Sequence, residues 1–376
     1  MAEKVEHTLA QTKGTFDLVG RVVNIDRENA YQEKTMDKGK NKGKSYRTLR
    51  FGIKTSESNI IQVSMFSFLP DEVYLWDSEN KKGGKVPYET WKKNRKGYEK
   101  QKKVPLQTRV GLEKGEDGKN ITMHLPSFDV MEYIYDNLNN EDSVMAKGSI
   151  SRNTYESRSG DVQTSVNYNL ESLFKLKNEV DFSDEKFEEK SVFTEQFIFE
   201  SADLDPRTKT TDVYGKVVNY HGKTNDVIYK INFANEEDSG LEQMAKIFAK
   251  KIDYGSLLQV HGNIVNRAVT EEVDVEPEDE MLALMAGERN RMNTTVSYVN
   301  YLEIRGTDAL ERAKYTEEDV ATGEDNFVVK KESAKEEDED LKAMKGKPKK
   351  EFKLEDEDDD FLDFGDDDLS DSDLPF

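Results

Sequence analysis

A basic segment with aromatic residues between its lysines is the part of the sequence whose residue types most directly indicate chemistry. Between residues 81 and 103, ten Lys and Arg side chains accompany only two acidic ones. Lysines neutralise phosphates and release counterions, and rings between them can stack on bases, so the pattern favours nucleic acid binding without sequence preference. The residues expected to make these contacts are Trp91, Lys92, Lys93, Arg95, Lys96 and Tyr98. Alternatively, the segment is a solvated loop whose Trp91 packs on the folded body.

Basic residues also recur on predicted strands. The alternation in residues 46–54 places Leu49, Phe51 and Ile53 on a core face and leaves polar and basic residues on the other. Arg21 matches Lys216 and Arg50 matches Lys230 in two similar segments, which favours a shared anionic ligand over generic solvent-facing cations. A hairpin loop at residues 152–160 is of the kind that touches nucleic acid in small β-barrels, unless it is a plain polar turn. The expected contact residues of the strands and this hairpin are Arg21, Tyr46, Arg50, Lys54, Arg152, Tyr155, Arg158, Lys216 and Lys230.

The C-terminus joins a run of aspartates to an apolar Leu-Pro-Phe ending. The ring of Phe376 can enter an apolar pocket while its carboxylate meets an arginine or backbone donors, which is a known way to read a C-terminus. Pro375 holds Leu374 extended, and the aspartates favour encounter with a basic rim. The pattern predicts a partner-binding tip rather than an ordinary solubility tail. Its residues are Asp371, Asp373, Leu374, Pro375 and Phe376.

This ending resembles the acidic tip of bacterial single-stranded DNA-binding proteins, which typically finish Asp-Asp-Asp-Ile-Pro-Phe. Here Leu374 stands in place of the isoleucine, and Ser370 and Ser372 interrupt the acids. The resemblance implies a protein that coats and protects single-stranded DNA in replication, recombination or repair and recruits partner proteins through the tip. The usual family member has one barrel per chain. Two barrels and a large insertion therefore favour a bacteriophage relative, acting as a monomer or a homodimer.

Two similar series of elements position these residues. The order β-β-(β)-α-β-β in both is that of the OB-fold, so we expect a mainly β protein with two tandem OB-fold-like barrels. The first series has strands at 16–24, 46–54 and 60–68, a helix at 128–138, and strands at 144–150 and 164–168. The second has strands at 211–219 and 227–233, a helix at 241–252, and strands at 258–264 and 294–298, with no clear third strand unless residues 193–200 supply it.

The segments between and beyond these series set the expected domain boundaries. We expect an N-terminal arm at 1–15, a first OB-like domain at 16–180 with a basic insertion at 70–126, a second at 181–310, and a disordered acidic tail at 311–376. Residues 332–376 contain 7 basic and 19 acidic residues, a net charge of 7 − 19 = −12. The total charge of −22 therefore does not exclude binding to DNA, because local fields decide binding.

Several classes of function lack support in the sequence. The absence of cysteine excludes disulfides, cysteine zinc sites and thiol catalysis, and the four histidines have no metal-ligand spacing. We expect a protein that is not an enzyme and uses no cofactor or metal. A polar N-terminus and the lack of a long apolar run predict a soluble cytosolic protein, and the resemblance implies the bacterial cytoplasm of a phage-infected cell. The alternatives are an OB-fold adaptor that binds proteins of a replication complex, and a nuclease or primase accessory.

Overall fold

The computed structural model describes residues 9–39, 41–106, 108–115, 118–156, 162–234, 239–272 and 294–323. The chain is mainly β, as predicted, with a mixed 13-stranded sheet and a separate three-stranded sheet. The elements are β1 (Gly14–Val23), β2 (Tyr31–Thr35), β3 (Ser45–Lys54), β4 (Ile60–Phe68), β5 (Glu72–Asp77), β6 (Lys82–Pro87), α1 (Tyr88–Lys100), β7 (Lys103–Pro105), β8 (Thr108–Gly111), β9 (Met123–Leu125), α2 (Ser127–Asn137), β10 (Ser143–Glu156), β11 (Val162–Lys175), β12 (Lys190–Asp205), β13 (Thr210–Val218), β14 (Thr224–Asn232), α3 (Ser239–Lys251), β15 (Leu257–Glu272) and β16 (Thr294–Glu311).

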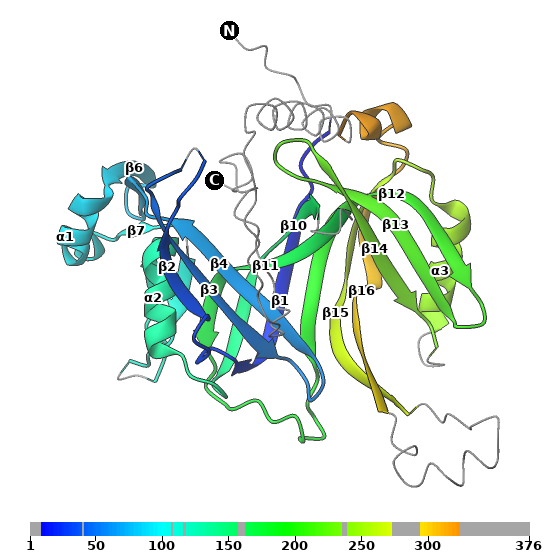
Figure 1. The fold of residues 1–376 in the computed structure, drawn as a ribbon, viewed down its shortest axis with the longest axis horizontal. Coiled ribbons are helices and arrows are strands. Elements are labelled where there is room, and N and C mark those ends of the chain that lie inside the picture. The colour runs from blue at the N-terminus through cyan, green and yellow to red at the C-terminus, as the bar shows by residue number, and fades with distance from the viewer. Residues whose placement is uncertain are drawn as a thin grey trace, which may run out of the picture.

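The large sheet has two halves with the same order of pairing (Figure 1). In the first half, β1 pairs with β3, β3 with β4, β4 with β11, β11 with β10, and β10 with β1. In the second half, β12, β13, β14, β16 and β15 repeat this series, and β15 pairs with β12. The β4–β11 and β14–β16 pairings are parallel and the others antiparallel. In both halves a helix, α2 or α3, lies between the third and fourth of these strands in chain order.

The two halves are joined by their first strands. β1 and β12 pair antiparallel from Gly14 opposite Glu195 to Val19 opposite Lys190. The two halves do not have separate sheets, because their strands form one continuous sheet that runs from β13 to β2 and is not closed as a whole. The free edge of a strand pairs readily with another strand. The sequence around β1 does not show that β12 is the strand that pairs with it.

The internal repeat is shifted by one strand relative to the sequence-based match. Residues 16–24 form β1, the first strand of its half, whereas residues 211–219 lie mainly in β13, which occupies the place of β3. Residues 193–200 belong to β12, the true first strand of the second half. The expected matches of Arg21 with Lys216 and of Arg50 with Lys230 are therefore wrong. Valine-rich runs around a glycine look alike in any strand, because β-propensity reports a half-buried pleated surface and not a place in a sheet.

A second joint fixes the halves relative to each other. Asn59, in the hairpin between β3 and β4, is fully buried against the second half. Its amide donates to the backbone oxygen of Ile264 on β15 at 2.9 Å and to Glu189 at 2.6 Å, and its side-chain oxygen accepts from the Asn266 backbone at 2.7 Å. Because both the donor group and the acceptor of the Asn59 side chain form hydrogen bonds, they hold the hairpin at a defined distance and orientation relative to the second half.

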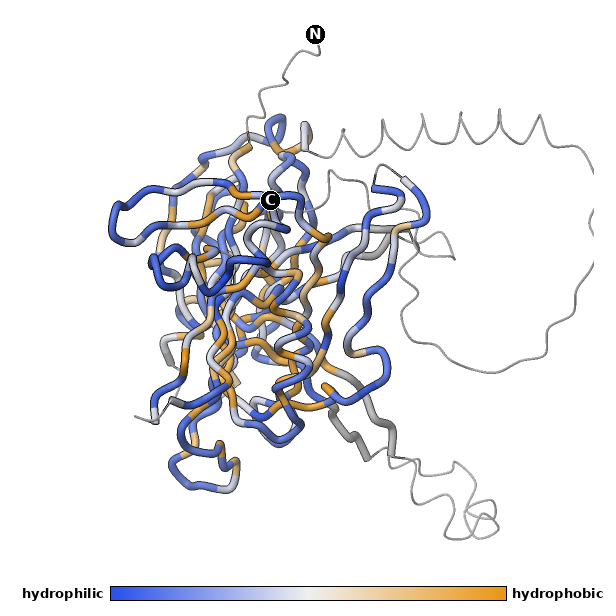
Figure 2. Tube along the Cα trace, turned by 90° about the vertical axis from the view of Figure 1, so that its left-hand side faces the viewer, coloured by the Kyte–Doolittle hydropathy of each residue, from blue (hydrophilic) through white to orange (hydrophobic). Residues whose placement is uncertain are grey.

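One apolar core extends through both halves. Alternate residues of β3, namely Leu49, Phe51 and Ile53, are buried as the sequence predicted, and Val130 and Ile134 of α2 cover them. In the second half Phe193, Phe197 and Tyr229 belong to the same cluster. Figure 2 shows hydrophobic segments concentrated inside the molecule and hydrophilic ones at the outer loops.

The predicted basic insertion is folded rather than a loop. We call β5, β6, α1 and β7 the insert lobe; its three strands form a sheet of their own in the order β6-β5-β7, and it extends from one end of the molecule (Figure 1). Trp91 of α1 is 3% exposed and packs on Tyr88, with ring centroids 5.9 Å apart. The remainder of the insertion, β8 and β9, joins the large sheet beside β11.

Ordered structure continues past the predicted start of the tail. Residues 317–323 are helical, and Tyr315 and Val320 are buried against Leu9, Ile198 and Val218. The expected disorder from residue 311 is therefore corrected for residues 311–323, because these two apolar side chains bind the segment to the second half. Residues 324–376, with the whole predicted tip, lie outside the described residues.

Candidate nucleic acid interface

The outer face of β3 and β4 combines rings and cations. β3 buries its odd-numbered residues from Arg47 to Ile53, and β4 buries those from Ile61 to Met65. The even-numbered residues of both strands therefore lie on the opposite face. The register places Tyr46 opposite Phe68, Thr48 opposite Phe66, and Arg50 opposite Ser64. We call this surface the outer β3–β4 face, defined by Tyr46, Thr48, Arg50, Lys54, Gln62, Ser64, Phe66 and Phe68.

Three half-buried rings form a cluster at one end of this face. The centroid of Phe66 lies 5.5 Å from that of Tyr46 and 5.2 Å from that of Phe68, and the Tyr46 and Phe68 centroids are 6.1 Å apart. These contacts hold each ring in place while its outer side stays accessible, because all three side chains are only partly buried. Ordered rings of this kind can stack on unpaired bases.

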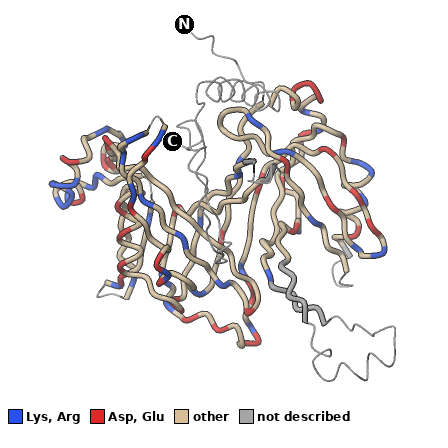
Figure 3. The backbone as a smooth tube through the Cα atoms, in the orientation of Figure 1, with Lys and Arg blue, Asp and Glu red and all other residues tan. Residues whose placement is uncertain are grey.

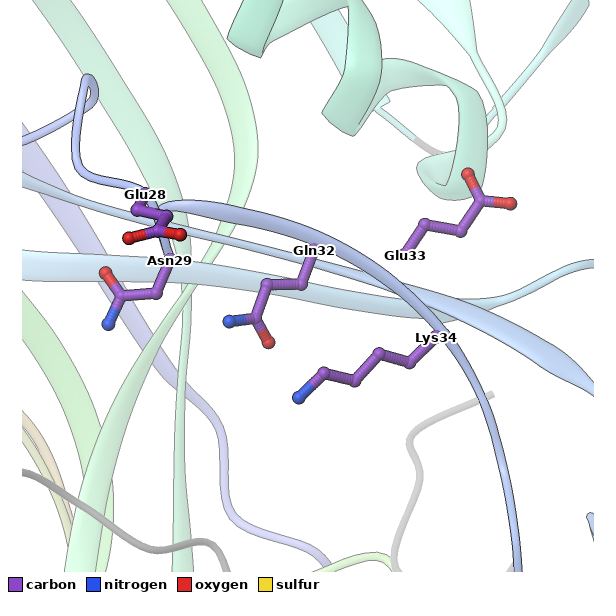
Figure 4. A pocket seen from close by; sticks show the side chains of 5 residues that line it. All are labelled: Glu28, Asn29, Gln32, Glu33 and Lys34. Atoms are coloured by element: carbon purple, nitrogen blue, oxygen red, sulfur yellow. The ribbon is translucent and has the colours of Figure 1, made fainter.

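Two cations lie beside the rings. Arg50 is partly enclosed, and burial lowers its pKa, although a guanidinium remains charged at neutral pH. Lys34 lies opposite Tyr46 in the β2–β3 register and is exposed. Figure 4 shows Gln32 and Lys34 on the same side of β2, with Glu33 turned toward α2; these residues line a shallow hollow together with Glu28 and Asn29. The positive charge can therefore meet phosphates next to the stacking rings.

Arg21 and Lys54 are adjacent but bind the protein itself. They are directly paired in the β1–β3 register, and both cations lie over the ring of Phe182, at 5.2 and 5.4 Å. Arg21 also donates to the Val180 backbone at 2.7 Å and approaches Glu141 at 3.3 Å, and Lys54 binds Glu57 at 2.8 Å. The segment that connects the halves thus covers this end of the outer β3–β4 face.

The predicted contact residues of the insertion divide by the face of α1 on which they lie. Trp91 is in the core, as in the packing alternative, and Tyr98 is partly buried against the core. Arg95 forms an ion pair with Glu99 at 2.8 Å. Lys92, Lys93 and Lys96 are exposed, and Figure 3 shows the basic residues of this lobe gathered at its end. α1 therefore offers phosphate contacts rather than a stacking platform.

Arg152 does not lie on a DNA-accessible hairpin tip. Its side chain is 4% exposed and forms a bidentate ion pair with Glu195. Tyr155 belongs to β10, with its strand partner Gln163 on β11, and Arg158 lies outside the described residues. The sequence identified the hairpin, but Arg152 serves the joint between the halves.

The predicted cations of the second half are paired with carboxylates. Lys216 contacts Asp226 at 2.6 Å and Glu200 at 3.7 Å. Lys230 lies 3.8 Å from Asp212 and 5.6 Å from the ring centroid of Tyr301. Both predicted cations of the second half therefore lie next to carboxylates of the chain itself.

Sequence reasoning missed Phe66, Phe68 and Lys34. A signal for the two phenylalanines was present, because Ile61, Val63 and Met65 define the core side of β4 and leave residues 66 and 68 on the other side. Lys34 belongs to β2, a strand with no buried residue in its span. The sequence of this strand therefore has no alternation of apolar and polar residues from which the face of Lys34 could be predicted.

Among the described residues, no group of three or more His, Asp or Glu side chains could hold a metal ion. None of the helices described is long and apolar enough to cross a membrane.

The model of the YorF family matches residues 13–340 of the chain. The chain belongs to the YorF family. The match spans both halves and the insert lobe of this YorF-family protein. No curated protein matches the chain.

Among solved structures, this YorF-family chain is similar to a deletion mutant of the single-stranded DNA binding protein from Thermus aquaticus. The identity is 12%, the TM-score is 0.35, and the match covers 82% of this chain and 98% of the other. A likeness at this level carries no argument about function.

Proposed function

We propose that this chain is a single-stranded DNA-binding protein without enzymatic activity, built from two OB-fold-like domains. The pairing order of each half supports the fold, since the OB-fold is a five-stranded Greek-key barrel whose second and third strands bind oligonucleotides. In the first half these places are taken by β3 and β4. The DNA would follow the outer β3–β4 face, and α1 would add phosphate contacts through Lys92, Lys93 and Lys96.

The observation that carries the proposal is the ring cluster of Tyr46, Phe66 and Phe68 next to Arg50 and Lys34. Surfaces that hold single strands without sequence preference combine cations along the backbone with rings that stack on successive bases. Duplex DNA hides its base faces, so rings on a surface give single strands an advantage that lysines alone do not.

The wider role rests on the C-terminal tip. We propose that the protein coats and protects single-stranded DNA in replication, recombination or repair in the bacterial cytoplasm. Residues 371–376 would recruit partner proteins, as the resemblance of the tip implies. The domains would comprise residues 16–180 and 181–310, in a monomer or homodimer.

The test is a fluorescence titration of the full chain with labelled oligo-dT, at two salt concentrations, with duplex DNA of the same length as the control. We expect tight binding of oligo-dT that weakens with salt, and much weaker binding of duplex. Equal affinity for the duplex, or no binding of oligo-dT at low salt, would overturn the proposal.

One observation favours a second candidate, a protein-interaction adaptor. On the outer face of β13 and β14, Ile228 is 57% exposed and lies opposite Tyr214, between the ion pairs of Lys216 and Lys230. An apolar patch with neutralised charges around it is typical of protein contacts. In this case the second half would bind protein, and oligo-dT affinity would be weak and insensitive to salt.

A further inference from the structure

A row of five polar side chains and one valine crosses the seam between the halves on a face that the proposed DNA contacts do not use. Each neighbouring pair in it is a register pair of adjacent strands. We call this the junction row; from the insertion to the second half it comprises His124 on β9, Arg109 on β8, Ser172 on β11, Lys147 on β10, Asp17 on β1 and Val192 on β12. Directly paired residues point to the same face of a sheet, so the six side chains lie side by side over roughly 24 Å, taking ~4.8 Å per strand.

The junction row lines a pocket. All six residues border one hollow of about 830 Å³, together with Leu106 and with Lys190 of β12. Leu106 is 55% exposed, so the pocket has an apolar wall next to its charged floor. The walls come from the first half, the second half and the segment that follows the insert lobe, so the pocket exists only because the halves are joined.

The charges favour an anion with hydrogen-bond donors. Lys147 and Lys190 both bind Oδ2 of Asp17, at 2.8 and 2.7 Å, and these lysines lower the Asp17 pKa although burial opposes them. Arg109 is exposed and stands two strands away from Lys147, with Ser172 between them. Glu171 also lines the pocket, so three cations face two carboxylates and the balance is positive.

Two buried polar atoms in the pocket have no hydrogen-bond partner among the described residues. They are Oδ1 of Asp17 and Nδ1 of His124. Nearly all buried polar atoms in folded proteins are hydrogen-bonded, so each of these two atoms is available to a ligand in the pocket. Burial and the nearby Arg109 lower the His124 pKa, so its ring is neutral at pH 7 and can either donate or accept.

We propose that the junction pocket binds a nucleotide, as a free 5′-phosphate or as one unit of a bound strand. The phosphate would lie over Ser172 between Arg109 and Lys147, a base or sugar donor would meet Oδ1 of Asp17, and the ring would rest on Leu106. A nucleotide is a common ligand that brings the anion, the donor and the flat apolar body together. The strand form of this inference rests on the proposed function; the free form does not.

The test follows the imidazole signal of His124 by NMR in the full chain, assigned with the His124→Gln variant, during addition of dTMP and, separately, oligo-dT. We expect the signal to shift and the His124 pKa to rise, because the negative charge of a phosphate bound in the same pocket favours the protonated form. A shift with both ligands indicates a free nucleotide site, and a shift with oligo-dT alone indicates a unit of the strand. If neither ligand moves the signal, the inference fails.

Arg109→Gln and Lys250→Gln form a matched pair for the binding measurement. Lys250 is an exposed cation on α3, outside the pocket. Arg109→Gln should abolish the His124 shift and lower the salt slope of oligo-dT binding by about 0.7, as expected for one lost phosphate contact, whereas Lys250→Gln should change neither. If both variants bind oligo-dT with equal salt slopes and the NMR signal of His124 does not shift, this inference is overturned and the proposed function still stands. Absence of all oligo-dT binding would overturn the proposed function instead.

Discussion

Arg152 on β10 and Glu195 on β12 form a bidentate ion pair across the seam between the two halves, with side chains 4% and 2% exposed. Tyr229 completes the arrangement by donating its hydroxyl to Glu195 at 2.8 Å. Burial opposes the charge on Arg152, but Glu195 more than compensates and raises the Arg152 pKa overall. Both charges of the pair are thus buried, and each is stabilised by the other.

Removing one partner of this pair should lower the stability of the fold strongly. Arg152→Met leaves the Glu195 carboxylate buried without its counter-charge, so we expect the free energy of unfolding to fall by about 3–5 kcal/mol. Urea denaturation followed by circular dichroism measures this. The double variant Arg152→Met, Glu195→Met should recover most of the loss, because replacing a buried pair by apolar residues is often nearly neutral. Full stability of the single variant would contradict the buried pairing.

Phe66 should contribute to DNA affinity without being needed for folding. Phe66→Ala removes one partly exposed ring, and we expect oligo-dT binding to weaken by roughly 1–3 kcal/mol, the effect of one stacked base. Tyr220→Ala serves as the control, because Tyr220 is 39% exposed but belongs to the second half. Titration at one low salt concentration compares the two. The same loss in both variants would show that the ring cluster has no special role.

The two faces of α1 should give opposite results. Trp91→Ala empties a buried site, and we expect a loss of about 3–5 kcal/mol in the stability of the region that contains it. Lys96→Gln changes an exposed residue, so thermal stability should stay the same while the salt slope of oligo-dT binding falls by about 0.7. Thermal melts and titrations of both variants test the assignment. A Lys96→Gln variant with an unchanged slope would remove α1 from the interface.

Asp129 of α2 contacts Tyr88 of the insert lobe, and this contact makes the stability of the protein depend on pH. Its Oδ1 accepts from the Tyr88 hydroxyl at 2.7 Å, and its buried Oδ2 has no hydrogen-bond partner among the described residues. Burial raises the Asp129 pKa although Tyr88 lowers it. The folded state therefore binds this proton more tightly than the unfolded state. The resulting stability is fully present below the ordinary value of 3.8 and is lost as the pH rises through the raised value.

Asp129→Asn removes this dependence, because its amide oxygen can still accept from Tyr88 and it carries no charge. We expect the variant to melt at the same or a higher temperature than the natural chain at pH 7, with the difference shrinking as the pH approaches 4. Melting curves across that range measure it. A variant that is less stable at pH 7 and gains on the natural chain as the pH falls would reverse the sign and refute the argument.

The sequence predicted most elements but not the way in which they pair. The alternation of Leu49, Phe51 and Ile53 located β3 because one face of that strand is buried. The place of β12 could not be inferred, since its partner β1 lies far away in the chain and strand pairing between distant segments has no local signature. The equivalence of Arg21 and Lys216 failed for the same reason.

The candidate site was predicted only in part. Tyr46 and Arg50 lie on the outer β3–β4 face as expected, because strand period alone decides their side. Arg152 was predicted to be exposed, because an arginine next to a loop usually is. Its buried partner Glu195 lies 43 residues further along the chain and could not be recognised from the sequence. The role of Trp91 was ambiguous, because a ring among lysines fits both a stacking surface and the buried side of an amphipathic helix. In the structure Trp91 lies on the buried side of α1.

The antiparallel ladder between β1 and β12 also has a directional consequence. It sets the two halves head to tail, so their corresponding surfaces run in opposite senses. A polynucleotide has a 5′ and a 3′ end, and it could cross both surfaces with the same chemical orientation only by making a U-turn between them. A strand held by one half alone can run straight on, which suits a chain in which Lys216 and Lys230 of the other half lie next to carboxylates.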